Sequence, residues 1–246
     1  MRVTLNGYVS ADEDLWLYEW YGYPAFGPST IRQALQDNPT DEELILEINS
    51  YGGNVWAGAE MYSVLRSSGV RTRAEVQSLS ASAASYMMLG CDEVWISPVA
   101  EVMVHLPATV TDGDRNEHRA SIHLLDSITE SILNAYELKS NGKKTRDELS
   151  RMMHSTEWLT AQEALDAGLV DGILYQGEAD PKLIVNAAAG SMHGMASALA
   201  MPDINKLREQ YYNTHNPAGA PATPINTWQE DAQRRLTIEK NRFGGM

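Results

Sequence analysis

Short apolar runs alternate with segments of helical spacing along most of the chain. The runs cover residues 3–9, 44–48, 70–76, 94–96, 102–105 and 170–174. Short, continuous apolar runs are typical of strands buried in a parallel sheet. Because helical segments separate most of these runs, the pattern predicts parallel strands joined by right-handed crossovers.

Helices are predicted from apolar spacing and capping residues. They cover residues 29–36, 57–65, 80–89, 119–138, 145–154 and 160–168. Two of them begin with a capping box, formed by Thr145 with Glu148 and by Thr160 with Glu163. Gly168 fits the end of the last helix because glycine readily adopts the left-handed conformation found there.

The helix over residues 119–138 is the longest element expected. One face carries Ile122, Leu125, Ile128, Ile132 and Tyr136. This spacing predicts that one side of the helix packs against apolar surface. In contrast, residues 20–28 are rich in Tyr, Gly and Pro and are predicted to form a loop.

A change of composition near residue 184 divides the chain. All the elements above lie before it, so we expect one domain over residues 1–180. Residues 181–246 are rich in Ala, Gly and Pro and are expected to be a linker and a weakly ordered tail. Within them, residues 216–224 are typical of a flexible linker, and one helix is predicted around 228–241.

Composition and charge narrow the classes of function. The chain has 246 residues, 43% hydrophobic and 21% charged, which supports a large core without disulfides. The formal charge of −14 argues against nucleic acid and anionic membrane as partners. No membrane-spanning run or leader pattern is present, and the single cysteine, Cys91, follows an apolar run and is expected to be buried. A cytoplasmic location is expected.

The histidines and the cysteine do not form a metal-binding pattern. His118 and His123 share a helical region, but their spacing does not suit a shared ion. Neither a His-Glu-x-x-His nor a Cys-x-x-Cys motif occurs in the sequence. We therefore expect no metal and no cofactor.

Three features indicate hydrolytic chemistry when they are taken together. Gly52 and Gly53 follow a strand, where backbone amides can approach a substrate carbonyl. Ser82 opens a small-residue segment after another strand, which suits an exposed nucleophile. His105 ends an apolar run and can act as a base near neutral pH. Each feature alone also fits a structural role: a strand-to-helix turn, a packed Ala/Ser helix, or a buried histidine.

In order and spacing, these features resemble the ClpP-type caseinolytic peptidase family. The matching motifs are Asn-Ser-Tyr-Gly-Gly at 49–53, Ser-Ala-Ser-Ala-Ala-Ser at 80–85, Met-Val-His-Leu-Pro at 103–107, an aromatic-led helix segment Trp-Leu-Thr-Ala-Gln-Glu-Ala at 158–164, and Ala-Gly-Leu-Val-Asp at 167–171. The likeness extends from residue 2 to residue 175. It implies an α/β fold with repeated β-β-α units in a ClpP/crotonase-like spiral core, and a protruding handle helix at 119–138.

The resemblance assigns the nucleophile and the base by position. Ser82 is implied as the nucleophile because it follows Ala81, as in the family's Ala-Ser pair. Ser80 and Ser85 are the alternatives within the same motif. His105 is implied as the general base.

The remaining roles depend on the backbone and on the third triad residue. The resemblance implies that the backbone N–H groups of Gly53 and Ala83 hold the oxyanion. The family places an aspartate two residues before the aromatic of its fourth motif, but that slot here is Thr156, with Glu157 beside it. Three alternatives stay open: Glu157 orients the histidine, Thr156 orients it without charge, or the acid lies elsewhere. Glu157 is the preferred candidate.

The implied function is that of a serine endopeptidase acting through an acyl-enzyme. Its peptide or protein substrate would add as a strand near residues 52–55 and 106–110. The resemblance also implies a homo-oligomeric ring, heptameric or doubled, with the handle helix between stacked rings. The short start and the tail resemble a phage-encoded branch that matures capsids by cutting scaffold or head proteins. Whether an ATPase docks is left open.

Three other functions are also consistent with parts of the sequence. A crotonase-like acyl-CoA enzyme has the same superfamily fold but needs no Ser–His pair. A catalytically weak structural or assembly protein of the same fold is consistent with the missing aspartate. A Ser–Lys peptidase would have to use a lysine from the later part of the chain, such as Lys143 or Lys144, because no lysine precedes Lys139.

Overall fold

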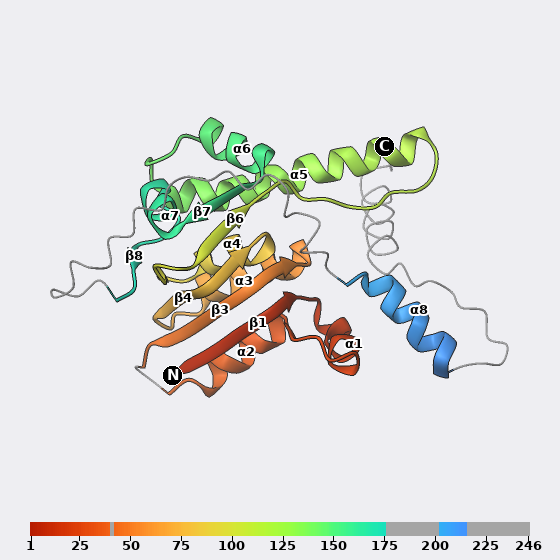
Figure 1. Cartoon of the computed structure of the whole chain (residues 1–246), viewed down its shortest axis with the longest axis horizontal. Helices are drawn as coiled ribbons and strands as arrows, with labels where there is room; N and C mark the ends of the chain where they lie inside the picture. The colour runs from red at the N-terminus through yellow and green to blue at the C-terminus, as the bar shows by residue number, and fades with distance from the viewer. Residues whose placement is uncertain (40–41, 176–201, 216–246) are drawn as a thin grey trace, which may run out of the picture. The chain divides into compact units, whose positions relative to one another are not determined.

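The computed structural model describes residues 1–39, 42–175 and 202–215 (Figure 1). The chain forms two compact units, Met1–Met201 and Pro202–Met246. In the second unit, one helix is described, α8 (Ile204–His215), within the segment expected to be weakly ordered. The predicted linker at 216–224 and helix at 228–241 lie outside the described residues.

One sheet organises the first unit. Its strands are β1 (Arg2–Val9), β2 (Ala25–Phe26), β3 (Leu44–Gly53), β4 (Thr72–Ala81), β5 (Glu93–Ile96), β6 (Glu101–Val104), β7 (Glu157–Thr160) and β8 (Gly172–Ile173). The order is β2-β1-β3-β4-β5-β8, with β6 paired to β4 and to β7. All pairs are parallel except β6–β7, which is antiparallel. The predicted α/β fold of the ClpP type is confirmed.

Helices cover the sheet and extend beyond it. They are α1 (Leu15–Trp20), α2 (Pro28–Asp37), α3 (Val55–Ser67), α4 (Ala83–Met87), α5 (Arg115–Ser140), α6 (Arg146–Ser155) and α7 (Ala161–Ala167), with short 3₁₀ turns at Asp12–Asp14 and Met88–Gly90. Helices α2, α3 and α4 lie along one face of the sheet, and α5 reaches past it (Figure 1).

The two faces of the sheet differ in chemistry. On the face covered by helices, Leu46 and Ile48 of β3 are fully buried. On the other face, Arg2 donates to Glu47 at 2.7 Å and to Glu75 at 2.8 Å. The predicted run is therefore buried over residues 44–46, where Ile45 is buried on this second face, and its charged residue Glu47 is paired there.

Several element boundaries differ from the sequence prediction. Strand β2 lies within the segment 20–28 that is predicted as a loop, and helix α1 ends at the first residue of that segment. Strand β4 continues to Ala81, so the helix expected from residue 80 begins at Ala83. The aromatic-led segment expected to be helical begins as β7, because Trp158 pairs with Met103 across the β6–β7 ladder.

Capping explains where the later helices begin. The capping boxes predicted at Thr145 and Thr160 are both present. A third box at Asp114 starts α5 earlier than expected, because its side chain accepts hydrogen bonds from two first-turn amides. Within the described part of the chain, no helix is long and apolar enough to cross a membrane.

Candidate active site

A hydrogen bond of 2.7 Å joins Ser82 Oγ and His105 Nε2. Ser82 follows the last residue of β4, and His105 follows the last residue of β6. These strands pair in parallel, with Ala81 beside Met103. Because parallel strands end at the same edge of a sheet, the fold brings the two side chains together.

The backbone of Ser82 adopts an unusual conformation. Its φ is 53° and its ψ is −123°, in a region that residues other than glycine rarely occupy. Its N–H donates to Met103 O at 2.9 Å, and its carbonyl accepts from Ser85 N–H at 2.9 Å. Such a sharp strand-to-helix turn presents the hydroxyl at the end of the sheet.

The other two serines of the motif are placed differently. Ser80 and Ser85 are each 0% exposed, whereas Ser82 is half-buried. Ser80 Oγ has no hydrogen-bond partner among the described residues. Ser85 Oγ donates to Ser82 O at 2.6 Å. Of the three, Ser82 is the serine that is bonded to the histidine, in the position predicted for the nucleophile.

Gly52 packs directly against Ser82. A Cβ atom at Gly52 would lie 2.4 Å from Ala81 O and 2.6 Å from Ser82 Cβ. Its φ is +84°, which also favours glycine. The sequence assigned a role to Gly53 and missed this close approach, because two adjacent glycines do not reveal which of them faces the neighbouring strand.

The amide of Gly53 points away from β1. Asn54 N–H donates to Val9 O at 2.8 Å, and Val9 pairs with Gly53, so the Gly52 carbonyl also faces β1. Because the described peptide bonds are trans, the Gly53 N–H points to the opposite side, toward β4. Ala83 is the first residue of α4, where helix amides have no partner within the helix. Both predicted amides therefore lie near Ser82, and their role as oxyanion donors stays a prediction.

Burial lowers the pKa of His105 below its ordinary value. The ring is therefore neutral near pH 7. A neutral imidazole that accepts the Ser82 proton at Nε2 carries its own proton at Nδ1. This protonation state suits a general base.

No acid contacts His105 within the described residues. The hydrogen bond to Ser82 is the one that its ring makes in that part of the chain. Glu157 Oε1 accepts from Ser155 Oγ at 3.0 Å, and Thr156 ends α6 in the left-handed region, with φ 56° and ψ 72°. The structure thus brings Ser82 and His105 together, and neither candidate for the third position forms a hydrogen bond with His105 among the described residues.

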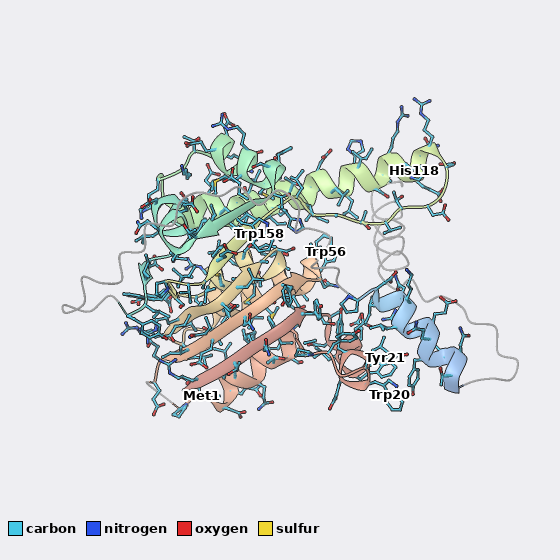
Figure 2. The ribbon with its side chains drawn as sticks, viewed as in Figure 1. Met1, Trp20, Tyr21, Trp56, His118 and Trp158 are labelled. Atoms are coloured by element: carbon cyan, nitrogen blue, oxygen red, sulfur yellow. The ribbon has the colours of Figure 1, made fainter. Side chains whose placement is uncertain are left out.

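Other reactive groups lie away from this pair. His118 is exposed on the outer part of α5 (Figure 2), where its Nδ1 lies 3.3 Å from Thr111 Oγ1. Cys91 is buried as predicted, and burial raises its pKa to about 12, so its thiol stays protonated. Among the described residues, no three His, Cys, Asp or Glu side chains gather in a metal-binding arrangement.

Comparison with known proteins shows the family of the chain. Residues 31–177, which include both members of the pair, match the family model described as Clp protease. An ATP-dependent Clp protease proteolytic subunit of Ligilactobacillus salivarius is 27% identical over 143 residues, covering 57% of this chain and 71% of the relative. A second relative, subunit 2 of Corynebacterium glutamicum, is 26% identical over 144 residues, covering 58% and 70%. Because the family model spans more than half of the sequence, the chain belongs to the Clp protease family.

Proposed function

We propose that this protein is a serine endopeptidase that cleaves peptide bonds through an acyl-enzyme on Ser82. The observation that carries the proposal is the 2.7 Å contact between Ser82 Oγ and His105 Nε2 at the shared edge of β4 and β6. Family membership supports it, since the relatives are named proteolytic subunits of Clp proteases.

The proposed reaction begins with attack of Ser82 Oγ on a peptide carbonyl carbon while His105 Nε2 takes the hydroxyl proton. The N–H groups of Gly53 and Ala83 stabilise the oxyanion of the tetrahedral intermediate. When the intermediate collapses, His105 returns the proton to the leaving amine. A water molecule, deprotonated by His105, then hydrolyses the ester and frees Ser82. Because His105 has no acid partner among the described residues, the pair acts as a dyad.

The substrate would bind as an added strand beside the end of β3. The ladder between β3 and β4 ends at the pair Ser50–Ser80, while β3 continues to Gly53. The backbone that follows Ser50 therefore runs past Ser82 beyond its pairing with β4. An extended peptide can align there through main-chain hydrogen bonds and present its carbonyl to the nucleophile.

Labelling with a serine-reactive phosphonate tests the assignment. The wild type should be labelled at Ser82, as located by peptide mass, and Ser82→Ala should not be labelled. Ser80→Ala is the matched control, because it lies in the same motif and its buried hydroxyl has no partner among the described residues. Undiminished labelling of Ser82→Ala would refute the nucleophile.

A catalytically weak assembly protein is the second candidate function. It is favoured by the one observation that His105 lacks an acid partner among the described residues. Hydrolysis of unstructured peptides by the wild type, abolished in Ser82→Ala, would exclude it. Turnover of acyl-CoA esters by the Ser82→Ala variant would instead favour a crotonase-like enzyme, which needs no serine nucleophile.

Assembly and natural substrate are further parts of the proposal. We expect a heptameric or doubled ring in which α5 contacts other subunits, because residues 115–120 are exposed on its projecting part (Figure 1). A native mass equal to the 27.2 kDa of one chain would refute the ring.

A phage scaffold or head protein is the proposed natural substrate. Co-expression of such a protein with the wild type and with Ser82→Ala tests this proposal. Short peptides should be cleaved without an ATPase.

A further inference from the structure

Two buried hydroxyl groups lie behind Ser82. Ser85 Oγ on α4 donates to the Ser82 carbonyl at 2.6 Å, and Tyr136 OH on α5 lies 2.6 Å from Ser85 Oγ. Ser85 is 0% exposed and Tyr136 is 2% exposed. The reaction described above uses neither group, so the presence of two polar side chains in the core needs a separate explanation.

Hydrogen-bond accounting fixes the direction of this chain. A serine hydroxyl has a single proton, and that of Ser85 goes to the Ser82 carbonyl. Tyr136 must therefore donate to Ser85 Oγ. Burial raises the pKa of Tyr136 far above its ordinary range, so the phenol keeps the proton that it donates. Each bond polarises the next one, which strengthens the contact at the carbonyl.

The contact matters because of the peptide unit that it holds. The Ser82 carbonyl and the Ala83 N–H belong to one planar trans peptide, so they point in opposite directions and rotate together. Ser82 lies in a conformation that persists only where its surroundings hold it. Because the Ser85 hydroxyl donates to the Ser82 carbonyl, this peptide unit cannot rotate freely. The Ala83 N–H therefore keeps one fixed direction, pointing away from Ser85.

We propose that Tyr136 and Ser85 are positioning residues, and that the relay from the Tyr136 hydroxyl through the Ser85 hydroxyl to the Ser82 carbonyl aims the Ala83 amide at the reacting carbonyl. The inference rests on the proposed function, which makes Ser82 the nucleophile and Ala83 N–H an oxyanion donor. It extends that function by assigning a role in transition-state binding to a residue on the long helix α5.

Three variants test the relay: Ser85→Ala, Tyr136→Phe and the double variant. Ser85→Ala removes one bond from the carbonyl and leaves the Tyr136 hydroxyl buried without its partner. It should lower the midpoint of thermal unfolding by about 3–10 °C and the rate of phosphonate labelling by about tenfold. Tyr136→Phe should lower the labelling rate by about threefold. In peptide hydrolysis, kcat should fall while KM stays unchanged, because the oxyanion exists only beyond the ground state.

The double variant separates positioning from simple stability. Removing both hydroxyls leaves no unsatisfied group, so its unfolding midpoint should return to within about 2 °C of the wild type. A positioning role predicts that its labelling rate stays as low as that of Ser85→Ala. A purely structural role predicts that the rate recovers together with stability, which would overturn the proposal.

Ser140, a buried serine on the same helix as Tyr136 (α5), provides the control. Ser140 Oγ donates to Ala167 O at 2.7 Å, away from the pair. Ser140→Ala should lower stability and leave the labelling rate within about twofold of the wild type. If wild-type Ser82 is not labelled, the proposed function fails and the relay with it. If wild-type Ser82 is labelled and both single relay variants react at the wild-type rate, the relay alone is refuted.

Discussion

Replacing Thr156 with aspartate tests how His105 is oriented. The β6–β7 ladder ends at the pair Val104–Glu157, and His105 and Thr156 are the residues next to this last pair on the two segments. Opposed residues of an antiparallel pair have Cβ atoms about 5 Å apart, so we expect a carboxylate at the residue just beyond the last pair to reach the histidine. Thr156 also has φ 56°, where a β-branched residue is disfavoured and aspartate is tolerated. The substitution should therefore fold without added backbone strain.

The size of the effect follows from the charge that forms on His105. Two unit charges about 4 Å apart attract by about 4 kcal/mol at an effective dielectric constant of about 20. Desolvation of the new carboxylate offsets about half of this attraction. The remaining ~2 kcal/mol stabilises the imidazolium in the transition state, which corresponds to acylation about 10- to 100-fold faster. This gain is below the ~10⁴-fold effect of a native triad acid, because the site is not arranged around a carboxylate.

The rate of Ser82 labelling between about pH 5 and pH 9 measures this gain. Burial lowers the pKa of wild-type His105, and a carboxylate on Nδ1 raises it. In Thr156→Asp, the plateau should rise and the acid limb should move to higher pH. Thr156→Asn is the matched control, since it tolerates the same backbone without charge. A folded Thr156→Asp protein with the plateau and the acid limb of Thr156→Asn would refute the reasoning.

Three further predictions concern stability and packing. Gly52→Ala should slow labelling of Ser82 by at least about 100-fold and lower the free energy of unfolding in a urea titration, because its Cβ would lie 2.4 Å from the Ala81 carbonyl oxygen of β4. Gly69→Ala is the control, since Gly69 also has a positive φ but no atom lies within 4 Å of the added Cβ. It should lower the free energy of unfolding by only about 1 kcal/mol. Because burial lowers the pKa of His105, the unfolded state binds more protons, so stability should fall as the pH drops below about 6.5. His105→Gln should flatten this trend in urea unfolding, and an unchanged slope would contradict it. Thr160→Ala should cost about 1 kcal/mol by removing a helix cap, with labelling of Ser82 unchanged.

Ser82 and His105 could be chosen from the sequence because they lie in motifs whose order and spacing resemble those of a known family. Ser82 lies in the small-residue serine motif and His105 ends an apolar run, and the parallel strands before them bring both residues to one edge of the sheet. Capping boxes were equally visible, since Thr145 and Thr160 act through residues three positions away. Motif order was therefore sufficient to choose the reactive residues, and local chemistry was sufficient to predict the helix caps.

Features that depend on contacts between distant segments could not be predicted. Trp158 lies in a strand because it pairs with Met103, although the segment that it leads continues as a helix. Helix α1 was missed because its aromatic and glycine-rich surroundings are typical of a loop. The polar face of the sheet could not be predicted, because it depends on Arg2 lying beside Glu47 and Glu75, which are far from it in the sequence.

The sequence by itself determined the fold class, the family resemblance and the two residues expected to react. These depend on periodicity and on motif order, which a single chain displays directly. The tertiary structure decided which glycine lies against Ser82, which serine contacts His105, and that Ser85 and Tyr136 stand behind the nucleophile. It also decided that the Glu157 carboxylate accepts a hydrogen bond from Ser155 and none from His105. Such outcomes depend on side-chain distances between segments far apart in the chain, and those distances are fixed only when the core packs.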